Sequence, residues 1–525
     1  MRPLSSTLAQ AALVAALAAT LYSFGLALSP PHLTHDEIKF ALQAKSIADT
    51  GRDINGRLLP LYFQEPGFSV GRDPLCIYVM AAVLRVLPFS EASIRFSTAL
   101  VGAVGVGLIL ILARRVFASA AVAWIVAITL ALSPTYYIHS RLALSVVYPV
   151  PFTILWLIAL HEYCTTRRPR MALAVGLVLG MGVYSYLAAA LLMPVYLLAT
   201  CVVLAFQRDW PAVRRVVAAF VLLMLPLLAW QAIEPQRYSN ILTAYRLYDE
   251  NPTTSGGLLQ QMVSGAGVTD RVNVFWDAFN PARLFFTGES SLQISTREVG
   301  SLLAPAAVLI VTGLATLLRS AQRPIERLLV VGLITAPLPG VIMADVEIRR
   351  WLVVLPFAAM MAGIGADRLR RAGTLGRATM AVLVALMALQ FAGFTRDYFG
   401  AYRERSSIWF GGNIRAALEM VLADARARTP SMVYIASDIP WVEAYWRFYS
   451  TVHGQSLLDR TRYVRLQSGE IPAAVPDAVI VTPKLDPALE ASLRAAGWAS
   501  FRTIPDLDGH PSLMVGSPAA PAPAP

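Results

Sequence analysis

Long apolar segments recur along this chain, and their length restricts its possible folds more than any other feature. Each runs for roughly 18 to 22 residues, the length of helix that spans the hydrocarbon of a bilayer. Of the 525 residues, 56% are hydrophobic and only 15% are charged, whereas a soluble protein carries about a quarter charged residues. The sequence therefore predicts a polytopic α-helical membrane protein.

About eleven segments are expected to cross the membrane, because each is apolar over the required length. They are 8–28, 94–113, 119–135, 145–163, 171–186, 188–206, 213–233, 300–318, 327–344, 350–366 and 378–395. The first is too long for the apolar region of a typical signal peptide, so we expect it to remain as an uncleaved helix.

Arginine clusters occupy alternate connections between these segments. The clusters are Arg114-Arg115, Arg167-Arg168-Arg170, Arg208 with Arg214-Arg215, Arg319 with Arg323 and Arg327, and Arg368-Arg370-Arg371-Arg377. The positive-inside rule assigns such loops to the cytoplasm. One orientation satisfies all of them, with the N-terminus in the cytoplasm and the C-terminal part outside. The net charge of +11 follows from this topology, and nucleic acid is not an expected partner.

The first predicted outer loop, 29–93, contains a helix over 36–50. Phe40, Ala44 and Ile47 fall on one face of it, and Lys39, Gln43 and Ser46 fall on another. This pattern is typical of a helix that lies at a membrane surface. Gly51 is expected to end it.

A second helix of the same loop is predicted over 74–88. It is apolar, but it is too short to span a bilayer and it contains Arg85. Counting it as a span would place every later arginine cluster outside. We therefore expect it to lie flat on the outer interface.

The composition changes near residue 397, which divides the chain into a transmembrane domain, 1–396, and a soluble part. A further long outer loop is expected over 234–299. Beyond residue 397 the patterns predict helices at 412–429, 441–450 and 487–496 and strands at 431–437 and 477–482. Alternating strands and helices indicate a small extracytoplasmic α/β domain over 397–517. The Pro-Ala tail, 518–525, is expected to be disordered.

The first candidates for chemistry are Asp36 and Glu37, at the start of helix 36–50. Thr34 and Glu37 have the spacing of a capping box, which gives Glu37 a structural explanation. Asp36 would be a favourable charge near the positive helix end. A rigid helix start also suits a catalytic base, because it holds the carboxylate in place. Partial desolvation beside a membrane raises the pKa of a carboxylate toward the range in which it accepts a proton usefully. The two interpretations are compatible.

Arg72, Arg141, Arg349 and Arg350 all lie in predicted outer loops. Each has a simple interpretation as an arginine that reaches lipid headgroups. Together around an acidic loop they also indicate an anion site, because guanidinium groups remain charged and bind phosphate in a bidentate way. Arg349 and Arg350 stand out, because they break the alternation of charged loops.

A metal site would need at least three ligands that converge in space. His35 and His139 occur singly near the outer loops, and the three cysteines, Cys76, Cys164 and Cys201, show no metal-ligand spacing. No metal ligand is therefore assigned, and a divalent metal remains an alternative. Aromatic residues near the span ends, such as Tyr186, are interpreted as interfacial side chains.

This order of features resembles the GT-C class of polyprenyl-phosphate-sugar-dependent glycosyltransferases. Within the class it is similar to the bacterial branch related to protein O-mannosyltransferases and to the aminoarabinose transferase that modifies lipid A. The resemblance covers roughly residues 8–400. It is strongest over 34–46, 72–95, 133–141 and 344–356.

The resemblance implies inverting transfer of a sugar from a polyprenyl-phosphate donor to a lipid, glycan or protein hydroxyl. The reaction would occur at the outer face of a bacterial inner membrane. By resemblance, Asp36 is the general base and Glu37 orients or tunes it. Arg72, and Arg349 or Arg350, match basic positions that contact the donor phosphate.

One position departs from the resemblance. Some relatives carry an acidic residue in the second outer loop, where this chain has Ser145-Val146-Val147-Tyr148. Either Arg141, a candidate donor-phosphate ligand, serves a role specific to a subgroup, or a second carboxylate comes from elsewhere in the chain.

Three other functions compete with this one. A transporter or lipid flippase would show inverted repeats, broken helices and ionisable groups at the membrane midplane, whereas ionisable groups here gather at one face. A polysaccharide polymerase or ligase would share the donor chemistry. A non-catalytic membrane scaffold would need none of it.

Overall fold

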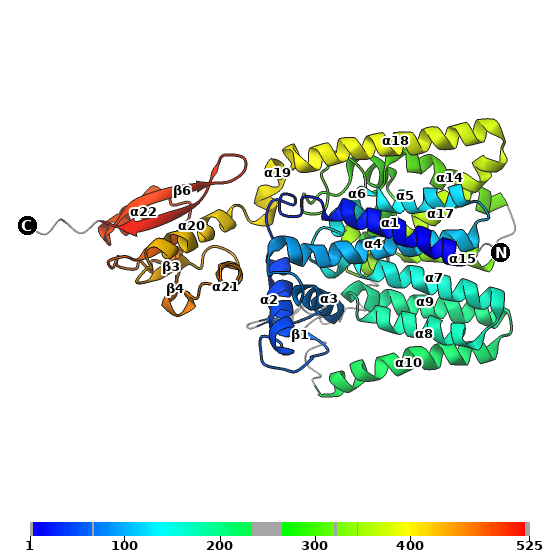
Figure 1. The fold of residues 1–525 in the computed structure, drawn as a ribbon, viewed down its shortest axis with the longest axis horizontal. Helices are drawn as coiled ribbons and strands as arrows, with labels where there is room; N and C mark the ends of the chain where they lie inside the picture. Colours follow the sequence, from blue (N-terminus) through cyan, green and yellow to red (C-terminus); the bar gives the residue numbers. More distant parts are fainter. Residues whose placement is uncertain (1–3, 66–67, 234–264, 320–322, 344, 520–525) are drawn as a thin grey trace, which may run out of the picture.

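A bundle of long apolar helices forms most of the molecule, and a small α/β domain extends from one end of it (Figure 1). This computed structural model describes residues 4–65, 68–233, 265–319, 323–343 and 345–519. Within these ranges, seven helical segments are long and apolar enough to cross a membrane. The predicted polytopic helical fold with a small C-terminal domain is confirmed.

Each predicted span coincides with one or two helices of the bundle. The bundle helices are α1 (Leu4–Ser23), α4 (Glu91–Val116), α5 (Ala120–Ala131), α7 (Pro149–Thr166), α8 (Pro169–Val183), α9 (Leu187–Phe206), α10 (Trp210–Ile233), α14 (Ala304–Arg319), α15 (Pro324–Thr335), α16 (Leu338–Met343), α17 (Val354–Arg371) and α18 (Thr374–Phe399). The helices α5, α8 and α14 are apolar but have 12 to 16 residues each, fewer than a full membrane span. Every residue of α17 from Val354 to Ala366 is buried, so this helix forms the centre of the bundle.

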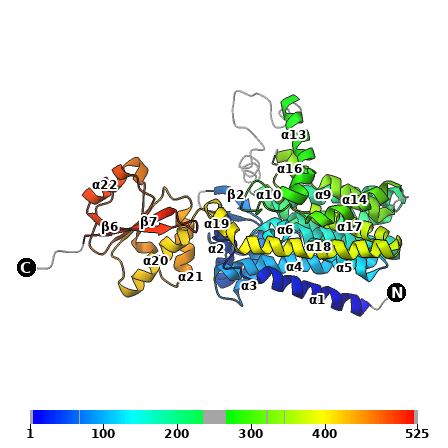
Figure 2. The same cartoon turned by 90° about the horizontal axis from the view of Figure 1, so that it is seen from above.

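Short helical elements connect the bundle helices. They are α6 (Pro134–His139), α13 (Gly265–Ala278) and the turns η1 (Ser145–Val147), η2 (Arg283–Thr287) and η3 (Ile348–Arg350). Of the predicted loop 234–299, residues 234–264 lie outside the described residues. The helix α13 contacts α16 and projects away from the bundle (Figure 2).

Two helices cover the end of the bundle that faces the C-terminal domain (Figure 1). They are α2 (His35–Thr50) and α3 (Pro74–Leu84), and a hairpin of β1 (Phe63–Glu65) and β2 (Phe68–Arg72) lies between them in sequence. Gly51 ends α2 with a φ of 71°, in the left-handed region that glycine tolerates best. Helices were predicted at both positions, and α3 packs against α2 and α4.

The polar side of α2 is not exposed as the helical pattern predicted. Lys39 and Gln43 are buried as well as the apolar residues of the helix. The Lys39 ammonium lies 3.6 Å from the centre of the Trp441 ring in the C-terminal domain. The Gln43 amide donates a hydrogen bond to the Gln64 carbonyl at 2.7 Å. This difference comes from tertiary contacts: the C-terminal domain and the loop after α2 cover this face of the helix.

The C-terminal part begins after α18 and contains one mixed sheet. Its elements are α19 (Ala401–Ser406), η4 (Ser407–Phe410), α20 (Ile414–Ala427), β3 (Val433–Ala436), α21 (Val442–Val452), η5 (Leu458–Arg460), β4 (Thr461–Val464), η6 (Leu466–Ser468), β5 (Val479–Pro483), α22 (Pro487–Ala495), β6 (Trp498–Pro505) and β7 (Pro511–Pro518). The strand order is β4-β3-β5-β7-β6. The strand β3 runs parallel to β4 and β5, whereas β7 runs antiparallel to β5 and β6.

Each predicted helix and strand of this domain is present, but β4, β6 and β7 were not predicted. The strand β7 extends to Pro518, the first residue of the predicted tail, and residues 520–525 lie outside the described residues. The domain is held on the bundle by buried tyrosines of α21. The Tyr449 hydroxyl donates to Glu91 of α4 at 2.7 Å, and the Tyr445 hydroxyl donates to the Leu33 carbonyl at 2.8 Å.

Candidate functional site

A cavity of about 350 Å³ lies beside the start of α2. It brings together Asp36, Arg349 and Arg350, which are three of the predicted site residues. The complete lining is Asp36, Phe40, Tyr62, Asp73, Leu144, Ser145, Val146, Val183, Tyr186, Leu187, Ala190, Pro194, Phe220, Met224, Leu227, Trp230, Arg349 and Arg350. The candidate base and the paired arginines, far apart in the sequence, thus share one space.

The cavity has a charged part and an apolar part. The charged groups are Asp36 and Asp73 together with the two arginines of η3. The apolar part is lined by α9 and α10, with side chains such as Leu187, Phe220 and Met224. A pocket that combines apolar walls with a few convergent charges suits an amphiphilic ligand.

Asp36 lies in the first turn of α2 and is partly exposed, with 38% of its side chain accessible. One carboxylate oxygen is 3.4 Å from Nε2 of His35. The His35 ring stacks on Trp441, with 5.0 Å between the ring centres and an angle of 10° between the planes. The C-terminal domain therefore supports the residue next to Asp36.

Glu37 has no accessible surface and does not line the cavity. Its carboxylate accepts hydrogen bonds from the backbone N–H groups of Thr34 at 2.9 Å and Ala143 at 3.0 Å. It also forms an ion pair with Nε of Arg95, at 2.9 Å, and Arg95 is equally buried. The capping box predicted for Thr34 and Glu37 is present. These contacts give Glu37 a positioning role: it fixes the start of the helix that carries Asp36.

Arg141 does not reach the cavity, which differs from the expectation that it binds phosphate. Its guanidinium is buried and donates to four backbone carbonyls at the end of α1 and just after it. The acceptors are Tyr22 at 2.8 Å, Phe24 at 2.6 Å, Gly25 at 3.0 Å and Ser29 at 2.7 Å. Both terminal nitrogens, Nη1 and Nη2, are thus engaged by backbone carbonyls, so Arg141 anchors the chain at the end of α1.

Arg349 and Arg350 are held in place by neighbouring acids of the same turn. Arg350 pairs with Asp345 at 2.8 Å, and it donates to the Tyr186 hydroxyl at 3.4 Å. Arg349 pairs with Glu347. Each guanidinium therefore has a carboxylate on one side and also lines the cavity.

Tyr186 belongs to the cavity wall, although the sequence alone favoured an interfacial role. The Tyr186 hydroxyl accepts a hydrogen bond from Arg350 at 3.4 Å, and its own O–H can donate a hydrogen bond into the cavity.

Asp73 is the residue that sequence reasoning missed. It precedes α3 at the N-cap position but forms no capping hydrogen bond with its side chain. Instead its carboxylate accepts a hydrogen bond from the Ser145 hydroxyl at 2.7 Å, inside the cavity. A second carboxylate therefore comes from the loop 29–93 and meets the connection between α6 and α7. The predicted phosphate ligand Arg72 ends β2 just before Asp73, and its side chain lies outside the described part of the structure.

His139 is buried and faces no metal cluster. Only 1% of it is accessible, and neither ring nitrogen has a hydrogen-bond partner within the described ranges. Burial, with a smaller effect from Arg349, lowers the pKa of His139 to about 3, so the ring is neutral. Among the residues that the structure describes, no three His, Cys, Asp or Glu side chains are grouped to hold a metal ion.

Comparison with known proteins shows which fold carries this cavity. Residues 70–230 match the sequence profile of the dolichyl-phosphate-mannose-protein mannosyltransferase family. The crystal structure of ArnT from Cupriavidus metallidurans bound to undecaprenyl phosphate aligns over 98% of both chains, with a TM-score of 0.54 and 14% identity. The chain has the GT-C glycosyltransferase fold.

The apo crystal structure of the same ArnT gives a similar match. It covers 97% of each chain, with a TM-score of 0.53 and 16% identity. No curated protein matches the chain significantly in sequence. The resemblance to GT-C glycosyltransferases of the ArnT and protein O-mannosyltransferase type, which the outer-loop features predicted, is confirmed.

Proposed function

We propose that this protein is an inverting glycosyltransferase that moves a sugar from a polyprenyl-phosphate donor to a hydroxyl acceptor. The reaction takes place at the extracytoplasmic face of a bacterial inner membrane, and the acceptor is a lipid, a glycan or a protein. The observation that carries the proposal is the cavity shared by Asp36, Arg349 and Arg350, with an apolar wall beside them. The GT-C fold, and the undecaprenyl phosphate bound to the similar ArnT, support it.

Asp36 supplies the base in this mechanism. The acceptor hydroxyl loses its proton to the Asp36 carboxylate as its oxygen attacks the anomeric carbon of the donor sugar. The bond between that carbon and the phosphate oxygen breaks on the opposite side, which inverts the configuration. The electron pair of this bond leaves with the lipid phosphate.

Arg349 and Arg350 stabilise the leaving phosphate. Negative charge develops on the phosphate oxygens as the sugar departs, and the two guanidinium groups are already oriented toward the cavity by Glu347 and Asp345. Such preorganised charges act most strongly in a site that excludes water. Tyr186 adds a neutral donor at the same side.

The apolar wall of α9 and α10 holds the prenyl chain of the donor. Its side chains include Leu187, Pro194 and Phe220. The Trp230 ring, near the end of α10, stacks on Tyr62 of the outer loop with 4.9 Å between the ring centres. These contacts join the membrane helix α10 to the loop and close one side of the cavity.

The direct test is incubation of the purified full chain with a panel of polyprenyl-phosphate sugars and hydroxyl acceptors. We expect one donor to release free polyprenyl phosphate and to yield a product whose anomeric configuration is opposite to that of the donor. Retention of configuration, observed by nuclear magnetic resonance of the product, would exclude single displacement.

Arg349→Ala and Arg350→Ala should each raise the apparent KM for the donor, by roughly 10- to 100-fold, because a charge-assisted hydrogen bond to phosphate is lost. The donor concentration dependence of purified variants measures this effect. Arg85→Ala is the matched control, since Arg85 follows α3 at the same end of the bundle and is exposed outside the cavity. Unchanged donor dependence in both variants would remove the arginines from the proposed site.

The proposed sidedness predicts a labelling pattern. In a background with Cys76, Cys164 and Cys201 replaced by Ala, Leu58→Cys should react with an impermeant thiol reagent added outside intact cells, because Leu58 is exposed in the outer loop. Arg170→Cys, in an arginine-rich connection, should react only after the membrane is permeabilised. The reverse pattern would overturn the orientation.

A further inference from the structure

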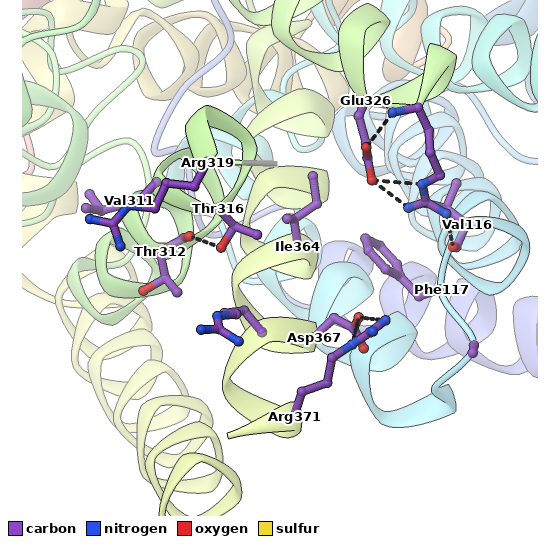
Figure 3. Close-up of a pocket in the computed structure, with 14 residues that line it drawn as sticks. Val116, Phe117, Val311, Thr312, Thr316, Arg319, Glu326, Ile364, Asp367 and Arg371 are labelled. Atoms are coloured by element: carbon purple, nitrogen blue, oxygen red, sulfur yellow. Dashed lines mark hydrogen bonds and ion pairs between the residues drawn. The ribbon is translucent and has the colours of Figure 1, made fainter. Parts of the chain in front are cut away.

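A second, larger cavity lies at the opposite end of the bundle from Asp36. It has a volume of about 800 Å³ and is lined by the end of α4, by α14, by the start of α15 and by the end of α17 (Figure 3). The helix α4 shows the separation: Glu91, at its start, contacts the C-terminal domain, and Val116, at its end, lines this cavity. Its 26 residues span about 39 Å. The two cavities are therefore separate sites.

The side chains around this second cavity carry a net positive charge. Four arginines line it, Arg319, Arg323, Arg368 and Arg371, together with two carboxylates. Both carboxylates are engaged, since Glu326 pairs with Arg323 at 2.7 Å and Asp367 pairs with Arg371 at 2.7 Å. Within the described residues neither Arg319 nor Arg368 forms an ion pair, so two positive charges remain uncompensated.

The cavity also has an apolar side. Val311 and Ala315 of α14 and Ile364 of α17 line it, and 61% of Val311 is accessible. Figure 3 shows Val311 and Ile364 among the charged side chains. The two helices meet backbone to backbone just before this point. A Cβ atom on Gly313 would collide with the Met361 carbonyl, and one on Gly365 would collide with the Leu309 carbonyl. This close contact of small residues fixes the position of α14 against α17, two of the helices that line the cavity.

We infer that this cavity binds an anionic phospholipid of the membrane. The phosphate lies between Arg319 and Arg368, and an acyl chain follows the apolar surface of Val311, Ala315 and Ile364. A soluble anion would use only the charged part, whereas a lipid uses both parts. Basic pockets between membrane helices bind anionic headgroups by this combination of charge and apolar contact. The site is independent of the transfer reaction.

The test compares two double variants of the full chain with equal loss of charge. Arg319→Gln with Arg368→Gln alters the cavity. Arg168→Gln with Arg170→Gln removes two exposed arginines from another arginine-rich connection, outside the cavity. Each protein is placed in phosphatidylcholine nanodiscs with and without phosphatidylglycerol. Tm measures stabilisation by the bound lipid, and the retention of phosphatidylglycerol is measured by native mass spectrometry.

Phosphatidylglycerol should raise the Tm of the unmodified chain and of the Arg168/Arg170 variant. The Arg319/Arg368 variant should bind it about 30-fold more weakly, because two arginine contacts are lost. If the two double variants showed the same Tm rise and the same retention of phosphatidylglycerol, the proposed lipid site would be wrong. A Tm rise produced by inorganic phosphate in pure phosphatidylcholine would overturn the assignment to lipid.

A third variant covers the case in which the Arg319/Arg368 variant does not fold. Ala315→Phe keeps every charge and fills the apolar part of the cavity. It should reduce the retention of phosphatidylglycerol, and undiminished retention would overturn the proposal by itself.

Discussion

Replacing Asp36 by Asn should lower the rate of sugar transfer by roughly 10²- to 10⁴-fold, because the amide cannot accept the acceptor proton. The amount of folded protein in the membrane should not change. Asparagine has nearly the shape of aspartate, and the Asp36 side chain is partly exposed, so the fold does not depend on its charge. The measurement is the single-turnover rate of purified protein with saturating donor, together with its abundance in membranes.

Two controls make this result specific to Asp36. Asp49→Asn removes an exposed carboxylate from the other end of α2, where it pairs with Lys45 at 2.7 Å, and it should leave the rate unchanged. Asp73→Asn tests the second carboxylate of the cavity. Full activity of the Asp36 variant with loss of activity in the Asp73 variant would show that Asp73 is the base.

Breaking the buried pair of Glu37 and Arg95 should give the largest loss of stability. Arg95→Met leaves the Glu37 carboxylate buried without its cation, and such a change costs about 3–5 kcal/mol. Neither side chain has accessible surface, and Arg95 also donates to the backbone carbonyls of Leu26, Pro30 and His32. Because a typical domain is stable by only about 5–15 kcal/mol, the variant should be depleted from the membrane.

Denaturant unfolding in detergent measures this difference. The matched control is Lys45→Ala, which breaks the exposed pair with Asp49 on the same helix and should cost less than about 1 kcal/mol. Glu37→Gln should lower the free energy of unfolding by about as much as Arg95→Met does. The double variant should lose less free energy of unfolding than the sum of the two single losses. Additive losses would mean that the two charges do not stabilise each other.

The bundle could be predicted because the length of an apolar segment is a local property. The same holds for the start of α2, where Thr34 and Glu37 are close in sequence and form the capping box that their spacing predicted. The partner of Glu37 could not be predicted, since Arg95 lies 58 positions away on another helix. An arginine at the start of an apolar span gives no signal of which acid it meets.

The roles within the candidate site depend on tertiary contacts in the same way. Asp73 before Pro74 has the pattern of a helix cap, and only the position of Ser145 reveals that its carboxylate turns into the cavity. Arg141 has the pattern of a phosphate ligand, but the chain after α1 presents its carbonyls to it. The strand β7 pairs with β6 and also joins the sheet beside β5, and no local pattern specified that second partner.

The location of the donor phosphate tests the central claim most directly. A structure of the Asp36→Asn variant with a polyprenyl-phosphate sugar should show the phosphate in contact with Arg349 or Arg350, the anomeric carbon facing residue 36, and the prenyl chain along α9 and α10. A phosphate bound elsewhere, with the cavity beside α2 empty, would contradict the proposed reaction site.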